Sequence, residues 1–160
     1  MFRVGFGFDA HKFSEDRKLV LGGVEIPFGL GLSGHSDADV LTHAICDALL
    51  GAIGEGDIGT HFPDGDPRFR GMSSLAFLSE ILSLLNAKGY EIQNIDSVIV
   101  CEKPRIAPHV AAIKYKLSQV SGMPEQALGI KATTTDRMGF TGRGEGIASY
   151  AVALIKTSSV

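Results

Sequence analysis

The sequence has no excess of basic residues. Its 160 residues include 15 Lys+Arg and 18 Asp+Glu, which gives a formal net charge of −3. Proteins that bind the phosphate backbone of nucleic acids usually carry a strongly basic face. The charge balance therefore disfavours a nucleic-acid partner.

Cysteine is scarce, and long apolar runs are missing. Cys46 and Cys101 lie in apolar contexts and match no CxxC or zinc-ribbon spacing. They are predicted to be small core residues in a reducing compartment rather than parts of a disulfide framework. No apolar stretch approaches the roughly 18 residues of a membrane span, and the first residues lack the apolar core of a signal peptide. We expect a cytoplasmic protein with no membrane partner.

Repeats, low-complexity segments and long linkers are also missing, so residues 1–160 are predicted to form a single domain. Hydrophobic residues make up 44% of the chain, which is enough for one sizeable core. Glycine accounts for 20 of the 160 residues, or 12.5%, against an average of about 7%. We expect these glycines to allow close approaches of the backbone.

Periodicity predicts strands and helices that are interleaved along the chain. Such an order indicates an α+β fold, an α/β-type sandwich in which helices pack on one face of a single mixed sheet. The predicted strands are 2–11, a hairpin at 18–28 with a turn at Gly22-Gly23, 95–101, 129–135 and 147–155, and the predicted helices are 36–54, 73–88 and 106–121.

Asp9, His11 and His43 are candidate metal ligands. Asp9 and His11 are two residues apart on a predicted strand, so their side chains share one face. His43 lies on the polar side of the predicted helix 36–54 and is the best third ligand. One carboxylate and two imidazoles with a fourth position open are typical of catalytic zinc. The alternative is a pair of surface polar residues and an unrelated helix histidine.

Two carboxylates lie four residues on either side of His43. Asp39, His43 and Asp47 are predicted to form a polar column that faces away from the apolar stripe of the helix. Asp39 or Asp47 could orient the imidazole through its second nitrogen. The alternative, an exposed helix carboxylate, is favoured for Asp39. Ser36 is predicted to be the N-cap of this helix.

The segment from Thr133 to Asp136, followed by Arg137 and Arg143, offers hydroxyl, carboxylate and guanidinium groups. These groups suit a phosphate and a hard cation. His35 and Ser36 precede a predicted helix, where free backbone N–H groups favour an anion. A polar strand end and a helix cap are the respective alternatives.

Five stretches together closely resemble the family of 2-C-methyl-D-erythritol 2,4-cyclodiphosphate synthases, and the resemblance covers nearly the whole chain. They are GFDAH at 7–11, GGVEIP at 22–27, HSDADVLTHAICDALLGA at 35–52, GDIGTHFPD at 56–64 and KATTTDRMGFTGRGEGI at 131–147.

The resemblance implies an enzyme of the non-mevalonate isoprenoid pathway, a phosphorus–oxygen lyase. The 2-phosphate of 4-diphosphocytidyl-2-C-methyl-D-erythritol 2-phosphate attacks the β-phosphorus, and CMP is released with the cyclic diphosphate. The expected setting is the cytoplasm of a bacterium.

The resemblance also assigns roles to residues. It implies one zinc ion per subunit on Asp9, His11 and His43, and transition-state stabilisation by His35 and Thr134. The residues implied to bind substrate are Asp9, Ala10, His11, His35, Ser36, Asp57, Ile58, Gly59, Phe62, Pro63, Asp64, Gly65, Asp66, Cys101, Glu102, Lys103, Pro104, Arg105, Ile106, Ala107, Ala132, Thr133, Thr134, Thr135, Asp136, Phe140 and Arg143.

Asp136 departs from the family pattern, which usually has Glu after the three threonines. In the family this carboxylate helps to hold Mg²⁺ or Mn²⁺ on the substrate diphosphate. The shorter side chain puts direct ligation in doubt and favours a bridging water. Arg105 also replaces a frequent Lys, which keeps the charge.

Family members are homotrimers with active sites at subunit boundaries. The resemblance places Phe8, Arg143 and Glu145 around a central cavity, where an isoprenoid diphosphate is an expected ligand. Because three arginines near one axis would repel one another, Arg143 is predicted to pair with Glu145 in the empty trimer.

Two other functions are kept as alternatives. One is a zinc-dependent phosphohydrolase that acts on a nucleotide diphosphate with metal-bound hydroxide. The other is a non-enzymatic trimeric protein that binds isoprenoid diphosphates.

Overall fold

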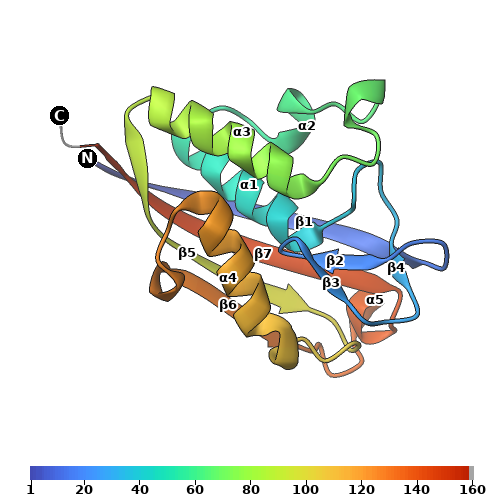
Figure 1. Ribbon diagram of the computed structural model, residues 1–160. Helices are drawn as coiled ribbons and strands as arrows, with labels where there is room; N and C mark the ends of the chain where they lie inside the picture. The colour runs from blue at the N-terminus through green and yellow to red at the C-terminus, as the bar shows by residue number, and fades with distance from the viewer. Residues whose placement is uncertain (159–160) are drawn as a thin grey trace.

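One five-stranded mixed sheet organises the chain (Figure 1). The computed structural model describes residues 1–158. The strand order is β4-β1-β7-β5-β6, in which β5 and β6 pair in parallel and the other neighbours pair antiparallel. The strands of this sheet are β1 (Phe2–Ser14), β4 (Gly31–Leu32), β5 (Tyr90–Val100), β6 (Leu128–Thr133) and β7 (Gly146–Thr157). The predicted α+β class and mixed sheet are confirmed.

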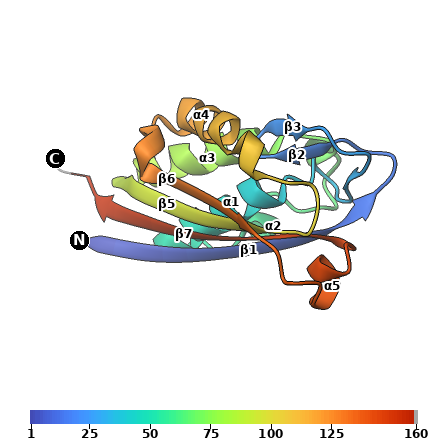
Figure 2. The same cartoon turned by 90° about the horizontal axis from the view of Figure 1, so that it is seen from below.

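Three longer helices cover one face of the sheet, as Figure 2 shows. They are α1 (Val40–Ile53), α3 (Ser74–Ala87) and α4 (Val110–Ser121). The remaining elements are the hairpin strands β2 (Leu19–Leu21) and β3 (Val24–Ile26), the short helices α2 (Ile58–His61) and α5 (Gly139–Gly142), and the 3-10 turns η1 (Pro67–Phe69), η2 (Ala107–His109) and η3 (Glu125–Ala127).

Most predicted elements are present with shifted ends. The turn between β2 and β3 uses Gly22 and Gly23 at φ 57° and 73°, in the left-handed region that favours glycine. The last segment is a strand, as its alternation predicts. The helix predicted from residue 106 begins as the 3-10 turn η2 before α4. Cys46 and Cys101 are both buried, as predicted.

Two glycines allow β1 to lie directly against α1. A Cβ at Gly5 would overlap the carbonyl oxygen of Ala48, and a Cβ at Gly7 would overlap that of Ala44. The side chains of a strand alternate, so Gly5 and Gly7 share the helix-facing side with Asp9, further along the same strand. This close approach brings the polar end of β1 next to α1.

Helix α1 is buried on nearly all sides, which corrects the predicted division into an apolar stripe and an exposed polar column. Asp39, the N-cap of α1, is fully buried and accepts hydrogen bonds from the backbone N–H groups of Gly22, Gly23 and Thr42 and from the Thr42 hydroxyl. The prediction of an exposed Asp39 is wrong because this carboxylate joins the β2–β3 turn to the helix. The prediction of Ser36 as the N-cap is wrong as well.

The face of β1 and β7 that turns away from the helices is apolar and exposed. Phe8 and Tyr150 pair across the strands with ring centroids 4.8 Å apart. The large hydrophobic residues exposed on these two strands are Phe2, Val4, Phe6, Phe8, Tyr150 and Val152. Among residues 1–158, no helix is long and apolar enough to cross a membrane.

Candidate active site

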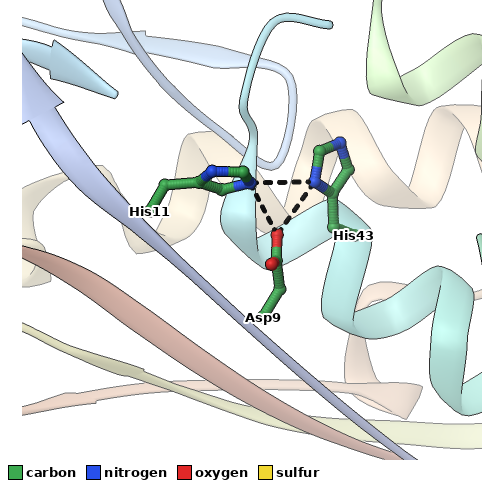
Figure 3. Close-up of side chains that lie close together, drawn as sticks. All are labelled: Asp9, His11 and His43. Carbon is green, nitrogen blue, oxygen red and sulfur yellow. Dashed lines mark hydrogen bonds and ion pairs between the residues drawn. The ribbon is translucent and has the colours of Figure 1, made fainter. Parts of the chain in front are cut away.

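Asp9, His11 and His43 meet at the end of the β1–α1 contact, as Figure 3 shows. Asp9 and His11 project from the same face of β1, and His43 lies in the first turn of α1. Oδ2 of Asp9 is 2.9 Å from Nε2 of His11 and 2.9 Å from Nδ1 of His43. The two imidazole nitrogens are 3.4 Å apart.

These three atoms are spaced as ligands of one ion. Zinc bonds of about 2.0 Å in a tetrahedral arrangement place ligand atoms about 3.3 Å apart. The observed separations of 2.9 to 3.4 Å are close to that value. A carboxylate oxygen and two imidazole nitrogens also suit zinc chemically, so the residues present fit a zinc ion.

The two histidines control the charge of Asp9. Burial alone would raise the pKa of Asp9, but hydrogen bonds and positive charge from His11 and His43 outweigh it and hold the pKa of that carboxyl well below its usual range. Burial opposes the charged form of His43, yet its hydrogen bond to Asp9 and the charges of Asp9, Asp39 and Asp37 raise its pKa. The Asp9 carboxyl is therefore held in its charged form.

The second ring nitrogen of His43 contacts hydroxyl groups, not carboxylates. Nε2 lies 2.7 Å from Oγ of Ser74 and 3.2 Å from Oγ of Ser36. The prediction that Asp39 or Asp47 orients His43 is wrong. Asp39 is occupied as the helix cap, and Oδ1 of Asp47 accepts from the N–H of Ile58 at 2.7 Å.

The loop with His35 and Ser36 is fixed by an arginine. The guanidinium of Arg17 donates to the carbonyl oxygens of Gly34 and Ser36, on both sides of His35. The carbonyl of His35 accepts from the N–H of Gly71 at 3.0 Å. His35 thus lies in a loop that Arg17 and the hydrogen bond from Gly71 hold just before α1.

Asp9, His11 and His43 form what we call the metal-type cluster, and a pocket of about 190 Å³ opens beside it. Several residues that the resemblance assigns to the substrate line it together with the cluster: Asp9, His11, His35, Ser36, His43, Ile58, Gly59, Phe62 and Asp64. Burial raises the pKa of Asp47, which also lines the pocket.

The segment after α1 contributes Ile58, Gly59, Phe62 and Asp64 to this pocket. Asp57 is exposed and caps α2 by accepting from the N–H of Thr60 at 2.8 Å. Phe62 is buried and stacks on Phe77 with ring centroids 4.4 Å apart. Pro63 and Gly65 are exposed, and Asp66 caps η1.

A second pocket, of about 230 Å³, lies at the ends of β5 and β6. The parallel pairing of Val100 with Thr133, and a backbone hydrogen bond of 3.1 Å from the N–H of Cys101 to the carbonyl of Thr133, bring the two predicted segments together. The lining consists entirely of residues that the resemblance assigns to the substrate: Cys101, Glu102, Pro104, Arg105, Ile106, Ala107, Ala132, Thr133 and Thr134. Lys103 is exposed beside it.

The loop after β6 presents Thr134 and Asp136 to solvent. Oγ1 of Thr134 lies 3.4 Å from Oδ1 of Asp136, whose φ is 51°. The N–H of Arg137 donates to Oε1 of Glu102 at 3.0 Å, which ties this loop to the second pocket. Oγ1 of Thr135 donates to the carbonyl of Met138 at 2.6 Å.

Three further predicted residues lie outside both pockets. Phe140 is 39% exposed in α5. Nε of Arg143 lies 2.6 Å from Oε1 of Glu145, so the predicted pairing of these two residues is present within the chain. The N–H of Ala10 donates to Oδ1 of Asp9 at 2.9 Å.

The predicted substrate residues thus line two separate pockets, and the remaining ones lie outside both. The two pockets have no lining residue in common. One holds the metal-type cluster on β1 and α1, and the other is built on β5 and β6. A single chain does not join them into one continuous site.

Sequence reasoning did not find Arg17, Asp37 and Ser74. Ser74 is fully buried, and it bonds both His43 and Asp37. No spacing or motif marks these residues, because their contacts join segments that are far apart in the sequence.

The comparisons with known proteins agree with this geometry. Residues 2–156 match the YgbB family. Proteins named 2-C-methyl-D-erythritol 2,4-cyclodiphosphate synthase are similar over nearly their full length. The one from Syntrophus aciditrophicus is 56% identical, with 96% of this chain and 97% of the relative covered. The one from Syntrophotalea carbinolica is 50% identical, with 99% and 97% covered.

A solved structure of such a synthase in its CDP-bound form has a TM-score of 0.89 and 37% identity, with 96% of this chain and 100% of that chain covered. The match of the whole fold, together with the cluster on β1 and α1, leads to one assignment. The chain belongs to the YgbB family, and the relatives named here are 2-C-methyl-D-erythritol 2,4-cyclodiphosphate synthases.

Proposed function

We propose that this protein is an enzyme of isoprenoid biosynthesis that converts 4-diphosphocytidyl-2-C-methyl-D-erythritol 2-phosphate to 2-C-methyl-D-erythritol 2,4-cyclodiphosphate and CMP. The observation that carries the proposal is the cluster of Asp9, His11 and His43, which lies beside a pocket lined by polar groups in a chain of this family. The names of the relatives support the same reaction.

In the chemical step, an oxygen of the substrate's 2-phosphate forms a bond to the β-phosphorus. The bond between the β-phosphorus and the bridging oxygen breaks, and that oxygen leaves on CMP with its electron pair. The nucleophile is already part of the substrate, so the enzyme gains rate chiefly by positioning it. Neutralisation of the crowded phosphate charge supplies the rest.

Asp9, His11 and His43 would hold a zinc ion. A dication at this cluster would neutralise phosphate charge and leave one coordination position for a phosphate oxygen. Zinc binds carboxylates and neutral imidazoles, and these three side chains supply that set of donors.

His35 and Thr134 are proposed to stabilise charge on the transferred phosphoryl group. Arg17 holds the backbone on both sides of His35, which keeps the imidazole beside the first pocket. Thr134 presents a hydroxyl at the second pocket. Groups that are fixed before reaction need no reorganisation when charge develops.

A Mg²⁺ or Mn²⁺ ion is proposed near Asp136, on the substrate diphosphate. Asp136 and Thr134 offer two oxygen atoms 3.4 Å apart on an exposed loop. Hard cations of this kind prefer oxygen ligands and keep several waters. The proposal leaves room for a water between Asp136 and the ion.

The second pocket is proposed to bind the cytidine. It lies at the ends of β5 and β6 and combines apolar residues such as Ile106 with the polar groups of Glu102 and Thr133, which suits a flat base and a ribose. A related synthase has been solved in a CDP-bound form, which supports a cytidine nucleotide as part of the substrate.

We propose that three chains associate through the exposed apolar face of β1 and β7. Phe2, Phe6 and Phe8 on this face are 65%, 63% and 45% exposed in the single chain, and such a patch usually marks an interface. Association would also unite the first pocket of one chain with the second pocket of its neighbour. Light scattering should give the mass of three chains, and Phe6→Glu should lower it.

A ligand site on the trimer axis is proposed from Phe8, Arg143 and Glu145. Arg143 and Glu145 are exposed and paired, so a diphosphate could replace the carboxylate as the partner of Arg143. Phe8 would then cover a prenyl chain, with roughly 0.8 kcal/mol per buried methylene. Calorimetry with geranyl and farnesyl diphosphate tests this. No binding, or binding that Arg143→Ala leaves unchanged, removes the axis site without affecting the synthase proposal.

Phosphorus NMR of the purified protein with the cytidylyl substrate tests the reaction. We expect the signals of a cyclic diphosphate and of CMP. Inorganic phosphate or an acyclic monoester would instead support a zinc-dependent phosphohydrolase. No turnover in the presence of zinc and magnesium would support a binding protein for isoprenoid diphosphates.

A further inference from the structure

His43 makes one of its shortest hydrogen bonds to a residue outside the pocket. Its Nε2 atom lies 2.7 Å from Oγ of Ser74, the first residue of α3. Ser74 is fully buried and does not line the pocket beside the metal-type cluster. Its hydroxyl therefore acts on the cluster only through His43.

The hydroxyl of Ser74 continues to a carboxylate. Its Oγ donates to Oδ1 of Asp37, and its backbone N–H donates to Oδ2 of the same residue at 2.8 Å. The N–H of Asp39 also donates to Oδ1 of Asp37, at 3.2 Å. Asp37 is thus held in place from two directions, by α3 and by the loop before α1.

The direction of these bonds follows from the cluster. Nδ1 of His43 faces Oδ2 of Asp9 and Nε2 of His11. An imidazole that binds a metal through Nδ1 carries its proton on Nε2, and that proton needs an acceptor. Oγ of Ser74 can accept this N–H because its own O–H points to another group, the carboxylate of Asp37.

We propose that Ser74 is a positioning residue for His43. The bonds run from Nε2–H of His43 to Ser74 and on to the carboxylate of Asp37, and they fix the ring and direct the Nδ1 lone pair at the metal. This inference rests on the metal centre of the proposed function. Ser74 touches neither the ion nor the substrate.

Ser36 does not replace Ser74 in this role. Its Oγ is farther from Nε2, at 3.2 Å, and it also lies 3.4 Å from the N–H of Ala38. Ser36 lines the pocket, where its hydroxyl is available to a ligand. Ser74 is fully buried and lies outside the pocket, so its hydroxyl is not offered to a ligand there.

Zinc affinity, measured by competition with a chromophoric chelator, tests the proposal without an activity assay. Ser74→Ala is expected to weaken zinc binding by about 10- to 100-fold, as is usual when the hydrogen-bond partner of a liganding histidine is lost. Ser73→Ala is the matched control. Ser73 is the N-cap of the same helix and accepts from the N–H of Leu75 at 3.3 Å, with no contact to His43.

Ser73→Ala should lower the melting temperature and leave the zinc dissociation constant within about twofold of the parent. A Ser74→Ala protein that binds zinc as tightly as the parent overturns the proposal. So does an equal loss of zinc affinity in both variants, because the effect would then come from the helix end.

Asp37→Asn provides a second test should Ser74→Ala fail to fold. The amide keeps one oxygen acceptor but removes the negative charge that accepts the hydrogen bond from the Ser74 hydroxyl. We expect weaker zinc binding and a shift of the Nε2–H signal of His43 in proton NMR of the zinc-loaded protein. An unchanged affinity and an unchanged signal overturn the proposal. Absence of zinc binding by the parent would instead overturn the metal centre of the proposed function, a result that does not depend on the variants.

Discussion

The carbonyl oxygen of Ala44 occupies the position that a Cβ at residue 7 would take, so only glycine fits there in β1. Ala44 follows His43 directly, and Gly7 precedes Asp9 by two residues on the same face of the strand. The contact between a strand glycine and a helix carbonyl therefore sets the distance between Asp9 and His43.

Gly7→Ala is expected to push α1 away from β1. Because the contact atom is backbone, it cannot rotate aside, and overpacking of this kind costs about 1–3 kcal/mol or more. The variant should unfold at lower denaturant concentration and should also bind zinc more weakly, since Asp9 and His43 separate. Chemical denaturation and chelator competition measure the two effects.

Gly51→Ala is the matched control for this change. Gly51 is an exposed glycine inside α1, and the nearest atom to an added Cβ is 3.8 Å away, which is ordinary contact. Alanine favours a helix interior by roughly 0.5–1 kcal/mol over glycine. Gly51→Ala should be at least as stable as the parent, and equal destabilisation of both variants would contradict the role of the Gly7 contact.

His43→Ala is expected to remove zinc and activity while the fold is kept. Loss of a ligand should weaken zinc binding by more than about 100-fold, beyond the effect of losing a partner of that ligand. Chelation of the parent should reduce activity in the same way. Zinc content is measured by atomic emission.

His109→Ala is the control for the loss of a histidine. His109 precedes α4 and makes no side-chain capping bond. The variant should retain zinc and activity. One zinc per chain in His43→Ala, with turnover at the parent rate, would show that the cluster is not the metal centre.

Asp47→Asn is expected to stabilise the metal-free protein at neutral pH. Burial raises the pKa of Asp47 against the opposing hydrogen bond from Ile58, and the charge of Asp57 adds to the increase. The carboxyl therefore contributes stability below the usual value of about 3.9 and loses it as the pH rises through the raised folded-state pKa. Asparagine keeps an oxygen acceptor for the N–H of Ile58 without the buried charge.

Melting temperatures measured with excess chelator test whether the stability contributed by Asp47 falls as the pH rises. The variant should melt a few degrees above the parent at pH about 8, and the difference should shrink as the pH falls and Asp47 takes up its proton. A difference that grows as the pH falls would show that the ionised form is the stabilised one.

Asp136→Glu is expected to lower the magnesium concentration needed for half-maximal rate. Asp136 is exposed, so there is room for a longer side chain, which reaches one methylene further. Asp136→Asn, which removes the charge, should raise the magnesium requirement and leave the zinc content unchanged. A requirement that glutamate leaves unchanged or raises would show that the shorter carboxylate of Asp136 is already accommodated.

Local patterns were sufficient for most of the secondary structure. The alternation of glycine and aromatic residues in 2–11 predicted β1, and the Gly22-Gly23 pair predicted the turn between β2 and β3. These features depend on near neighbours, whose effect on backbone conformation can be read from short segments. The same logic placed Asp9 and His11 on one face of a strand.

The burial of Asp39 at the start of helix α1 could not be predicted from local patterns. The pattern around Asp39 and Asp47 predicted polar groups facing solvent, whereas Asp39 is fully buried and bonded to Gly22 and Gly23. Burial of a carboxylate depends on donors that come from another part of the chain. No periodicity within the helix encodes those donors.

The sequence by itself determined the residue types of the metal-type cluster, the strand and helix that carry them, and the family to which the chain belongs. Only the tertiary structure decided that Ser74 and Asp37 support His43, that the substrate residues form two separate pockets, and that aromatic side chains of β1 are left exposed. The physical reason is that spacing along a strand or helix fixes the direction of a side chain, whereas its partners are fixed by packing between elements that are distant in sequence.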